Sequence, residues 1–415
     1  MSILSAERLI ELRLDHGERL PIVAVEGGAP PVMTTVYAVA VLRSGGRSPN
    51  TIAAHLRAIL IARRWARTRG FQLEDRMQEG RLLPEREIED LVRALRERQD
   101  SKGDESAPPG PSPARRRAGM EALRRSAFGS GKGVDPGVAA NRVRFVRDYL
   151  VWLARHSRRS GLEVEIERMA AGFSARTKGT AATHAEPRRG LDVDQRAQLL
   201  KLIDPSAPEN PFSHPPTRLR NALIVRLLYA TGARRGEIAG LKIRDIDPKA
   251  STIAIHRRGD DPDDPRTAPP RAKTAARVVP CDPALIRDLT SYALGARRAE
   301  PGAKRHPFLF VAHRGGTPGA PLSTRQIGKV FEVIADALGF DVHAHLLRHT
   351  WNDRFSEMQD ARLTPRAEAS EERIRGVLMG WSPESKMPAR YSRRHAERLA
   401  KEAMRNLTKG ILSDE

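Results

Sequence analysis

Two arginines, a histidine and a tyrosine in the second half of the chain are the side chains that attack on a phosphodiester requires: Arg234, His345, Arg348 and Tyr391. Such a reaction passes through a five-coordinate phosphorus with one extra negative charge, which fixed cations stabilise. Arginine suits this task because its planar fork holds two phosphate oxygens and stays protonated. A phenol can attack the phosphorus and form a covalent intermediate. These residue types therefore indicate cleavage and rejoining of a nucleic acid backbone without a metal.

The local sequence predicts how these side chains are presented. Arg234 lies in YATGARRGE, where one helix is expected to end at a glycine and another to begin. His345 and Arg348 are three apart in HLLRHTW and project from one face of a predicted helix. An unperturbed tyrosine titrates near ~10. We therefore expect the two guanidiniums to lower the pKa of Tyr391, and His345 to accept its proton.

Each of these residues also has a more ordinary interpretation when it is taken alone. An arginine is usually a solvated surface charge, and His345 would usually cap a helix or be partly buried. Tyr391 would be a core aromatic. We expect His349 to pack and hydrogen-bond as a structural residue in either case. The ordered set favours the chemical interpretation.

Five separate segments resemble the tyrosine recombinase (phage integrase) family. They are TGARRGE at 231–237, Lys273-Thr274 before a Val-Val-Pro strand, HLLRHT at 345–350, LMGW at 378–381, and Tyr391. The resemblance covers roughly residues 190–395, and the helical first half is similar to the family's core-binding domain. It implies a mainly α fold with a small β-sheet, in which a helical SAM-like core-binding domain precedes a catalytic domain of the DNA breaking-rejoining fold.

The resemblance also implies roles for the residues around the phosphate. Arg234 and Arg348 would hold the scissile phosphate, and His345 would assist proton transfer. Lys273 would protonate the departing 5′ oxygen, with Lys242 as a weaker candidate for the same role.

Three further roles follow from the same resemblance. Trp381 stands where the family has His or Trp against the phosphate, although an indole N–H offers a single donor and the residue is otherwise a packing tryptophan. Tyr391 would form the covalent 3′-phosphotyrosine, and Glu237 would support the first arginine. Ten positions separate Trp381 from Tyr391, and two prolines lie between them, Pro383 and Pro388.

The overall charge indicates a polyanionic partner. Lys and Arg outnumber Asp and Glu by 72 to 51, which gives a formal net charge of +21. Double-stranded DNA is the first candidate. The acidic run at 260–264 lacks the spacing and glycine of a calcium loop, so we expect an extended loop there and no metal site. Because a phosphotyrosine would conserve the bond energy of the cut strand, we expect no cofactor either.

The single cysteine, Cys281, excludes an internal disulfide and is typical of a reducing compartment. Charged residues interrupt the first twenty residues, so they lack the apolar stretch of a signal peptide. No run is long enough to span a bilayer. We therefore expect a cytoplasmic protein without a membrane partner.

At 415 residues the chain is expected to form two domains with connecting segments. The predicted parts are an N-terminal arm (1–29), a helical DNA-binding domain (30–160) with a mobile insertion (about 101–135), a linker (161–190), and a catalytic domain (191–415) with a C-terminal helix (394–408).

Helical spacing of apolar residues predicts four helices in the first domain, around 33–43, from about 50 to 69, from 84, and at 141–158. The second and fourth carry arginines beside the apolar stripe, and we expect these to contact DNA: Arg57, Arg64, Arg67, Arg142, Arg144 and Arg147. The alternative is that they form merely solvated faces.

The second domain is predicted to mix helices with a few strands. A helix over about 217–231 should end at Gly232, and another should begin at Ser323. Strands are predicted at 252–256 and 277–280, with a possible third at 309–311.

Together these features favour a site-specific DNA recombinase of a mobile element, acting as a tetramer of DNA-bound protomers as the resemblance implies. One alternative is a type IB topoisomerase-like protein, which relaxes DNA without site choice. The other is a non-catalytic DNA-binding protein that keeps the same fold.

Overall fold

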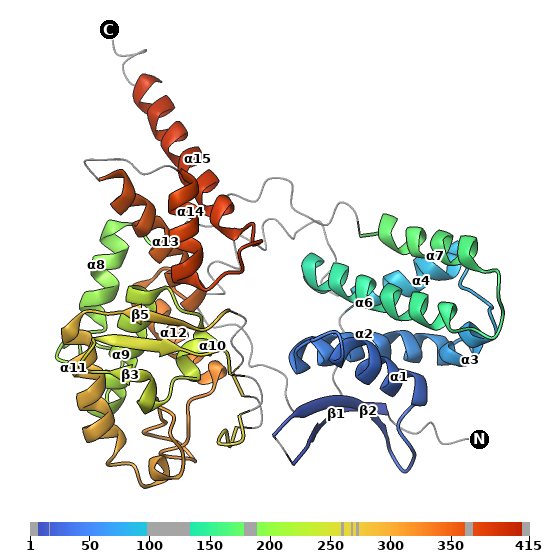
Figure 1. Cartoon of the computed structure of the whole chain (residues 1–415), viewed down its shortest axis with the longest axis horizontal. Helices are drawn as coiled ribbons and strands as arrows, with labels where there is room; N and C mark the ends of the chain where they lie inside the picture. The colour runs from blue at the N-terminus through green and yellow to red at the C-terminus, as the bar shows by residue number, and fades with distance from the viewer. Residues whose placement is uncertain are drawn as a thin grey trace. The chain divides into compact units, whose positions relative to one another are not determined.

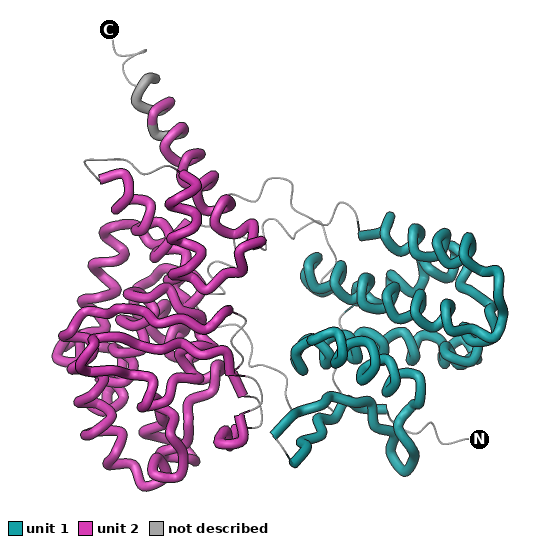
Figure 2. Tube along the Cα trace, in the orientation of Figure 1, with its two compact units in different colours: residues 1–109, 123–185 teal, residues 110–122, 186–415 magenta. Residues whose placement is uncertain are grey.

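The computed structural model describes residues 7–15, 17–97, 133–177, 189–258, 261–266, 269–270, 274–361 and 368–408. These residues divide into two compact units (Figure 2). Unit 1 contains the described residues up to 177, and unit 2 contains those from 189 onward. Each unit has its own apolar core.

Unit 1 is built around one long helix. Its elements are β1 (Glu7–Arg13), β2 (Arg19–Val25), α1 (Val32–Val36), the π-helical segment η1 (Tyr37–Arg43), α2 (Pro49–Arg67), α3 (Leu73–Gln78), α4 (Glu85–Arg96), α6 (Pro136–Arg155) and α7 (Glu163–Ala175). Helix α2 packs against α6, α4 and β2 (Figure 1). It begins where the sequence predicts, because the Ser48 side chain accepts a hydrogen bond from the Thr51 N–H at 3.3 Å.

The predicted N-terminal arm is wrong for residues 7–25. These residues form an antiparallel hairpin, and β2 packs against α2. Leu20, Ile22 and Val23 are buried in the core of unit 1. The apolar run of β2 covers one side of α2, which is why the hairpin belongs to the domain.

The predicted linker is wrong over its first half. Helix α7 packs against α6 and α4, and buries Ile166, Met169 and Phe173. These three residues recur at helical spacing, a signal that the sequence interpretation missed. Residues 178–188 of the predicted linker lie outside the described residues, as does most of the predicted insertion at about 101–135.

Unit 2 is mainly helical. Its elements are α8 (Val193–Leu202), α9 (Pro215–Thr231), α10 (Arg235–Ala239), η2 (Ile243–Asp245), β3 (Ile246–Asp247), β4 (Thr252–Ile255), β5 (Arg277–Pro280), α11 (Pro283–Tyr292), η3 (Ala293–Arg297), η4 (Pro301–Arg305), α12 (Thr324–Leu338), α13 (Ala344–Asp360), α14 (Glu368–Met379) and α15 (Met387–Thr408). Helix α9 is buried along most of its length and packs against α13 and α11. Helix α15 packs against α13 and α14 (Figure 1).

A three-stranded antiparallel sheet in unit 2 has the order β3-β4-β5. Two of its strands lie where the sequence predicts them. The third strand is Ile246–Asp247, so the predicted strand at 309–311 is wrong; Val311 makes only an isolated bridge to Pro321. The predicted class, mainly α with a small sheet, is confirmed, and the hairpin of unit 1 adds a second small sheet.

The C-terminal helix begins seven residues earlier than the predicted start at 394. Helix α15 starts at Met387, so Tyr391 lies in its second turn. Pro388 stands in the first turn, where a proline's missing N–H costs no hydrogen bond. None of the helices in the described residues is long and apolar enough to cross a membrane.

Candidate active site

The left-handed turn at the end of α9 packs closely against α13 and α14. Gly232 has φ of +60°, and a Cβ at this position would lie 2.7 Å from Cε of Met379 and 2.9 Å from Cγ of Trp351. The Gly232 carbonyl accepts a hydrogen bond from Nη1 of Arg348 at 2.7 Å. Only glycine combines this backbone conformation with such close neighbours.

Arg348 is held rigidly in the interior of unit 2. It is 2% exposed, and its Nη2 donates a second hydrogen bond to the Met379 carbonyl at 3.3 Å. Burial, followed by repulsion from Arg234, lowers the pKa of Arg348 to about 10, with Glu237 and Tyr391 opposing the shift. The guanidinium therefore remains charged at neutral pH. Its electrostatic neighbours lie at the start of α10 and on α15.

Arg234 lies at the start of α10, as the sequence predicts. Its backbone N–H donates to Oε2 of Glu237 at 3.0 Å, and its Nη1 lies 3.6 Å from Oε1 of the same carboxylate. Nη1 is buried and makes no hydrogen bond with the described residues. Arg234 thus keeps donor capacity beside Arg348.

Glu237 connects α10 to the β5 region. Its side chain is fully buried, its Oε2 accepts from Nη2 of Arg277 at 2.8 Å, and its Oε1 accepts from the Thr274 hydroxyl. Burial raises the pKa of Glu237, but Arg277, Thr274 and the Arg234 N–H outweigh it, so the net shift is downward. Arg277 is a part of the cation cluster that sequence reasoning missed. The neighbouring Lys273, the predicted general acid, lies outside the described residues.

Tyr391 is buried against the indole of Trp381. The two rings stack at 5.6 Å with an interplanar angle of 15°, and the Arg348 guanidinium lies 5.3 Å from the Trp381 ring. Tyr391 is 4% exposed, and Nε1 of Trp381 is buried with no hydrogen-bond partner among the described residues. The structure therefore brings the predicted nucleophile, tryptophan and second arginine together.

The expected lowering of the Tyr391 pKa is wrong. Burial raises the pKa of Tyr391 above its ordinary value, and the opposing charges of Arg348 and Arg394 do not cancel it. The physical reason is desolvation, which disfavours the phenolate before any phosphate or DNA is bound. Tyr391 is therefore a neutral phenol at physiological pH.

The hydroxyl of Tyr391 is hydrogen-bonded to a different histidine from the one predicted. Its Oη lies 2.9 Å from Nδ1 of His349, which is 9% exposed. His345, the predicted proton acceptor, is exposed and packs edge-on against His349, with ring centroids 4.6 Å apart. His349 therefore belongs to the group of residues that contact Tyr391, although the sequence predicted only a structural role for it.

Arg394 of α15 is the second arginine, after Arg348 of α13, that lies close to the phenol. Arg394 lies over the Tyr391 ring at 4.9 Å, and its Nη1 lies 3.3 Å from Nδ1 of His349. Its Nη2 is ion-paired with Asp353 of α13, whose other oxygen accepts the Gly190 N–H at 2.8 Å. Asp353 therefore connects the first described residues of unit 2 to the helix that carries the tyrosine.

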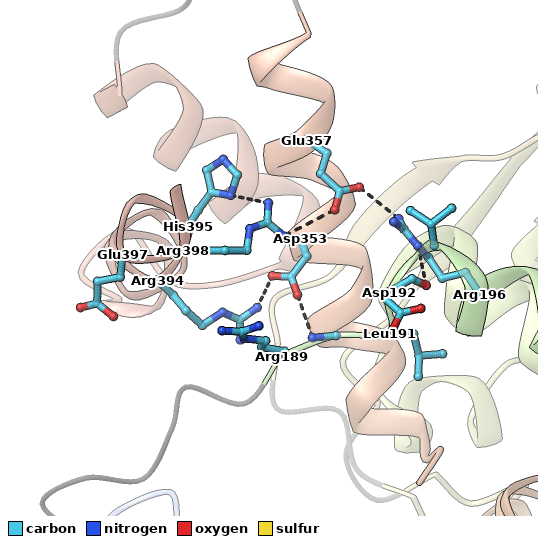
Figure 3. Close-up of a pocket in the computed structure, with 12 residues that line it drawn as sticks. Arg189, Leu191, Asp192, Arg196, Asp353, Glu357, Arg394, His395, Glu397 and Arg398 are labelled. Carbon is cyan, nitrogen blue, oxygen red and sulfur yellow. Dashed lines mark hydrogen bonds and ion pairs between the residues drawn. The ribbon is translucent and has the colours of Figure 1, made fainter. Parts of the chain in front are cut away.

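These contacts line a pocket of about 230 Å³ between α15, α13 and the start of α8 (Figure 3). In addition to the Arg394–Asp353 pair, Glu357 of α13 forms ion pairs with Arg398 at 3.5 Å and with Arg196 at 3.1 Å. The pocket is lined by alternating charges that attach α15 to α13.

The rival lysine has another partner. Lys242 is 1% exposed, and its Nζ donates to Asp261 and Asp263, each at 3.0 Å. Two carboxylates of the acidic run thus bind an internal ammonium, whereas the sequence suggested an extended, solvated loop. Asp260 itself lies outside the described residues.

In unit 1, three of the six arginines predicted to contact DNA are exposed: Arg57, Arg64 and Arg144. Arg57 and Arg64 lie on α2. Arg144 lies on α6, where its guanidinium stands 5.4 Å from the Phe145 ring. These three side chains present positive charge at the surface of the unit.

The other three arginines are less exposed and make contacts within unit 1. Arg67 is 3.2 Å from Glu7, and Arg147 is 2.7 Å from Asp148. Arg142 donates to the carbonyls of Leu95 and Glu97 at 3.1 Å and 2.9 Å. The helical stripes therefore mix surface charges with residues that stabilise the fold.

The residues that the sequence interpretation missed follow simple helical spacing. His345, His349 and Asp353 are four apart and share one face of α13. Tyr391 and Arg394 are three apart and share a face of α15. A search for polar residues at these spacings around the nucleophile would have found His349, Asp353 and Arg394.

A comparison with protein families gives one match in this region. Residues 190–364 match the model of the phage integrase family. The resemblance seen in the sequence motifs is confirmed for this part of the chain.

Curated relatives match over a similar region. The chain is 28% identical over 169 residues to tyrosine recombinase XerD of Mycobacterium leprae, which covers 39% of this chain and 46% of that protein. It is 30% identical over 141 residues to tyrosine recombinase XerC of Bacillus pumilus, covering 33% and 40%. The chain thus spans about half or less of the length of these relatives.

Solved structures are similar over more of the chain at low identity. A lambda integrase dimer bound to a COC′ core site is 14% identical with a TM-score of 0.46, covering 87% of this chain and 94% of that chain. The Tn1549 transposon integrase in complex with circular intermediate DNA is 17% identical with a TM-score of 0.44, covering 82% and 99%.

Proposed function

We propose that this chain, whose residues 190–364 form a phage integrase family domain, is a site-specific DNA recombinase that cuts and rejoins DNA through a 3′-phosphotyrosine intermediate. The observation that carries the proposal is the contact of Tyr391 with Trp381, whose ring also meets the Arg348 guanidinium. A phenol beside a buried cation has the arrangement that attack on a phosphate requires.

The proposed phosphate site lies between two arginines. Arg348 is fixed by two carbonyls, which leaves part of its fork for phosphate oxygens. Arg234 contributes the Nη1 donor that makes no hydrogen bond with the described residues, and Trp381 contributes its buried Nε1. Glu237, held by Arg277, orients Arg234 through the backbone of α10. Donors fixed before the reaction lose little freedom as charge develops on the phosphate.

The proposed reaction conserves the energy of the phosphodiester. Oη of Tyr391 forms a bond to phosphorus while the bond to the 5′ oxygen breaks, and Lys273 gives that oxygen its proton. Attack by a 5′ hydroxyl of the partner strand reverses these steps and releases Tyr391. The reaction therefore needs neither ATP nor a cofactor, and the guanidiniums supply the charge that a metal supplies in other phosphotransferases.

The proposed partner is double-stranded DNA carrying a specific site. The net charge of +21 supports this, as do the exposed arginines of α2 and α6. Both units would contact the same duplex, and four protomers would assemble on two sites to exchange strands. We further propose that a mobile element supplies the sites and that the protein works in the cytoplasm, where the single Cys281 stays reduced.

A nicked suicide duplex tests the proposed reaction. After cleavage, the short fragment that carries the free 5′ hydroxyl diffuses away, and its loss prevents rejoining. We therefore expect an SDS-resistant adduct from the wild-type protein. Tyr391→Phe should form none while still shifting the duplex in a native gel. Tyr229→Phe is the matched control. The Tyr229 ring lies 4.0 Å from the Arg354 guanidinium and takes no part in the site around Tyr391. Absence of adduct with the wild-type protein on a library of random-sequence nicked duplexes would contradict the proposal.

Relaxation of a supercoiled plasmid separates recombination from topoisomerase-like activity. We expect no relaxation of a plasmid without a site, and relaxation or recombination only when a site is present. Efficient relaxation of site-free plasmid would favour the type IB topoisomerase alternative.

A further inference from the structure

One ring nitrogen receives two contacts from the C-terminal helix. Nδ1 of His349 lies 2.9 Å from Oη of Tyr391 and 3.3 Å from Nη1 of Arg394. Both partners come from one face of α15, and His349 itself is 9% exposed. The contact therefore excludes bulk water from the phenol proton.

Arg394 determines which tautomer of His349 fits this geometry. A guanidinium has only N–H donors and no acceptor, so Nδ1 must accept. A neutral imidazole with an accepting Nδ1 carries its proton on Nε2. The Tyr391 hydroxyl must then donate to Nδ1, and its proton points at the histidine. The ion pair of Arg394 with Asp353 holds the guanidinium in this place.

We propose that His349 is the general base that takes the proton of Tyr391 when the phenol attacks DNA, a role that rests on the proposed recombinase function. The Oη–H bond breaks and the proton moves to Nδ1, which makes His349 an imidazolium. Oη forms its bond to phosphorus, and the electron pair of the broken P–O bond leaves with the 5′ oxygen. During rejoining the phenolate departs and takes the same proton back from Nδ1.

The other side chains around Tyr391 are less suited to this step. Arg348, Arg394 and the indole of Trp381 are donors only. His345 lies at the surface and reaches the group through its edge-on contact with the His349 ring. Burial keeps Tyr391 protonated, so attack requires an acceptor at hydrogen-bond distance.

A leaving-group substitution distinguishes a base on the phenol from an acid on the 5′ oxygen. A duplex with a bridging 5′ sulfur releases a thiolate, which needs less help from an acid because a thiol titrates near ~8.5. His349→Asn keeps an amide near the position of Nδ1 but has no basic nitrogen. We expect His349→Asn to slow adduct formation by about 10²- to 10⁴-fold on both the oxygen and the sulfur substrate. Lys273→Ala should be slow on oxygen and restored on sulfur.

The pH profile supplies a readout that a structural role would not move. The titratable and charged groups around His349 are Tyr391 and Arg394 of α15, and His345 and Asp353 of its own helix. Protonation of Nδ1 blocks proton acceptance, so the wild-type cleavage rate should fall on the acid side of its profile. His349→Asn should lose this acid limb, whereas His345→Asn should retain it. DNA affinity and melting temperature, measured in parallel, show that each variant is folded.

Several results would overturn the assignment. They are a His349→Asn rate equal to that of the wild type, an acid limb that persists in this variant, and full recovery of its rate on the sulfur substrate. Should this variant not fold, ¹⁵N spectra of histidine-labelled wild-type protein and Tyr391→Phe still give a test: one Nδ1 resonance should have the shift of an unprotonated nitrogen and move on removal of the hydroxyl. A protonated Nδ1 there would contradict the proposal. If wild-type protein forms no adduct on any duplex, the recombinase function fails instead.

Discussion

Arg348, in the second turn of the helix that also carries His349, is fixed between two backbone carbonyls. This arrangement determines the direction of its planar fork. A lysine at this position would keep the charge but lose the paired donors. The shape of the guanidinium, as well as its charge, should therefore matter for cleavage.

We predict that Arg348→Lys and Arg234→Ala each lower the rate of adduct formation by about 10²- to 10³-fold, the cost of removing one preorganised donor. Their DNA affinity should change by less than about tenfold. Quantified suicide-duplex kinetics beside gel-shift titration give both numbers. Arg354→Lys, on the same helix but over Tyr229, is the control. Wild-type kinetics in either site variant would remove that arginine from the phosphate site.

The ion pair of Glu237 with Arg277 should make the stability of unit 2 sensitive to acid. Its pKa is lowered in the folded protein, so its contribution to stability is present above the unfolded value and is lost as the pH falls through the folded one. Glu237→Gln leaves Arg277 buried without a counter-charge and should cost roughly 3 kcal/mol near neutral pH.

We predict that the difference in melting temperature between wild type and Glu237→Gln begins to narrow as the pH falls below about 4.3, the pKa of an unfolded glutamate. The difference should vanish only below the lowered folded pKa, where the wild-type carboxylate is neutral as well. Thermal scans of both proteins from pH 3 to 7 measure it. A difference that stays constant over this range would show that the charge of Glu237 does not contribute.

The sequence motifs predicted most of the residues that meet at the site, since Arg234, Glu237, Arg348, Trp381 and Tyr391 lie within segments of specific spacing. They did not predict the partner of the phenol. The direction of a hydrogen bond depends on how two helices far apart in the chain pack against each other, and spacing within one helix does not contain that information. The raised pKa of Tyr391 was missed for the same reason, because burial is a property of the packed site.

At the level of elements, α13 and α15 act together. Two ion pairs along the pocket of Figure 3 and a histidine–carboxylate contact beyond it join these helices. Arg394–Asp353 stands beside Tyr391, Arg398–Glu357 lies one turn further on, and His395 reaches Asp360 at 2.6 Å. The pair nearest the tyrosine also contacts His349 and Gly190, so it has the largest influence on the nucleophile.

We predict that Asp353→Asn lowers kcat for cleavage by about 10- to 100-fold with little change in KM, because Arg394 and the Tyr391–His349 pair lose their fixed position. Glu357→Gln, one turn along α13, should change kcat by less than about threefold. Single-turnover cleavage at saturating and limiting DNA separates the two constants. Equal effects of both variants would indicate that the ion pairs only attach the helix.

Helices were the most predictable elements: a capping residue precedes the apolar spacing at α2 and α12, and a C-terminal glycine marks the end of α9. The hairpin of unit 1 and helix α7 were not predicted. β1 mixes charged and apolar residues without regular alternation, and its Glu7 pairs with Arg63 of α2 at 2.7 Å. Tertiary contacts of this kind, together with the pairing of β1 with β2, distinguish the strand from a solvated arm.

At the scale of the whole molecule, the proposed function divides between the units: unit 2 holds the chemistry, and unit 1 contributes affinity for the phosphate backbone. Arg57 and Arg64 of α2 are exposed, whereas Arg142 is bound to carbonyls of α4 and the residue after it. The same residue type therefore serves two purposes within one helical unit.

We predict that Arg57→Ala and Arg64→Ala each reduce the slope of log K against log salt concentration by about 1, since each removes one phosphate contact. Arg142→Ala should leave the slope unchanged and lower the melting temperature instead. Arg93→Ala, an exposed arginine on α4, is the surface control. Fluorescence anisotropy over a range of salt concentrations measures the slopes. An unchanged slope in both α2 variants would place the DNA elsewhere on the unit.

The central claim is that the phenolic oxygen of residue 391 becomes bonded to a DNA phosphorus. Mass spectrometry of the trapped adduct tests it most directly, after nuclease and protease digestion reduce it to one peptide and one nucleotide. We expect a 3′-linked nucleotide phosphate on the peptide that contains Tyr391, with fragment ions that place the added mass on that side chain. A nucleotide found on any other residue, or a 5′ linkage on Tyr391, would contradict it.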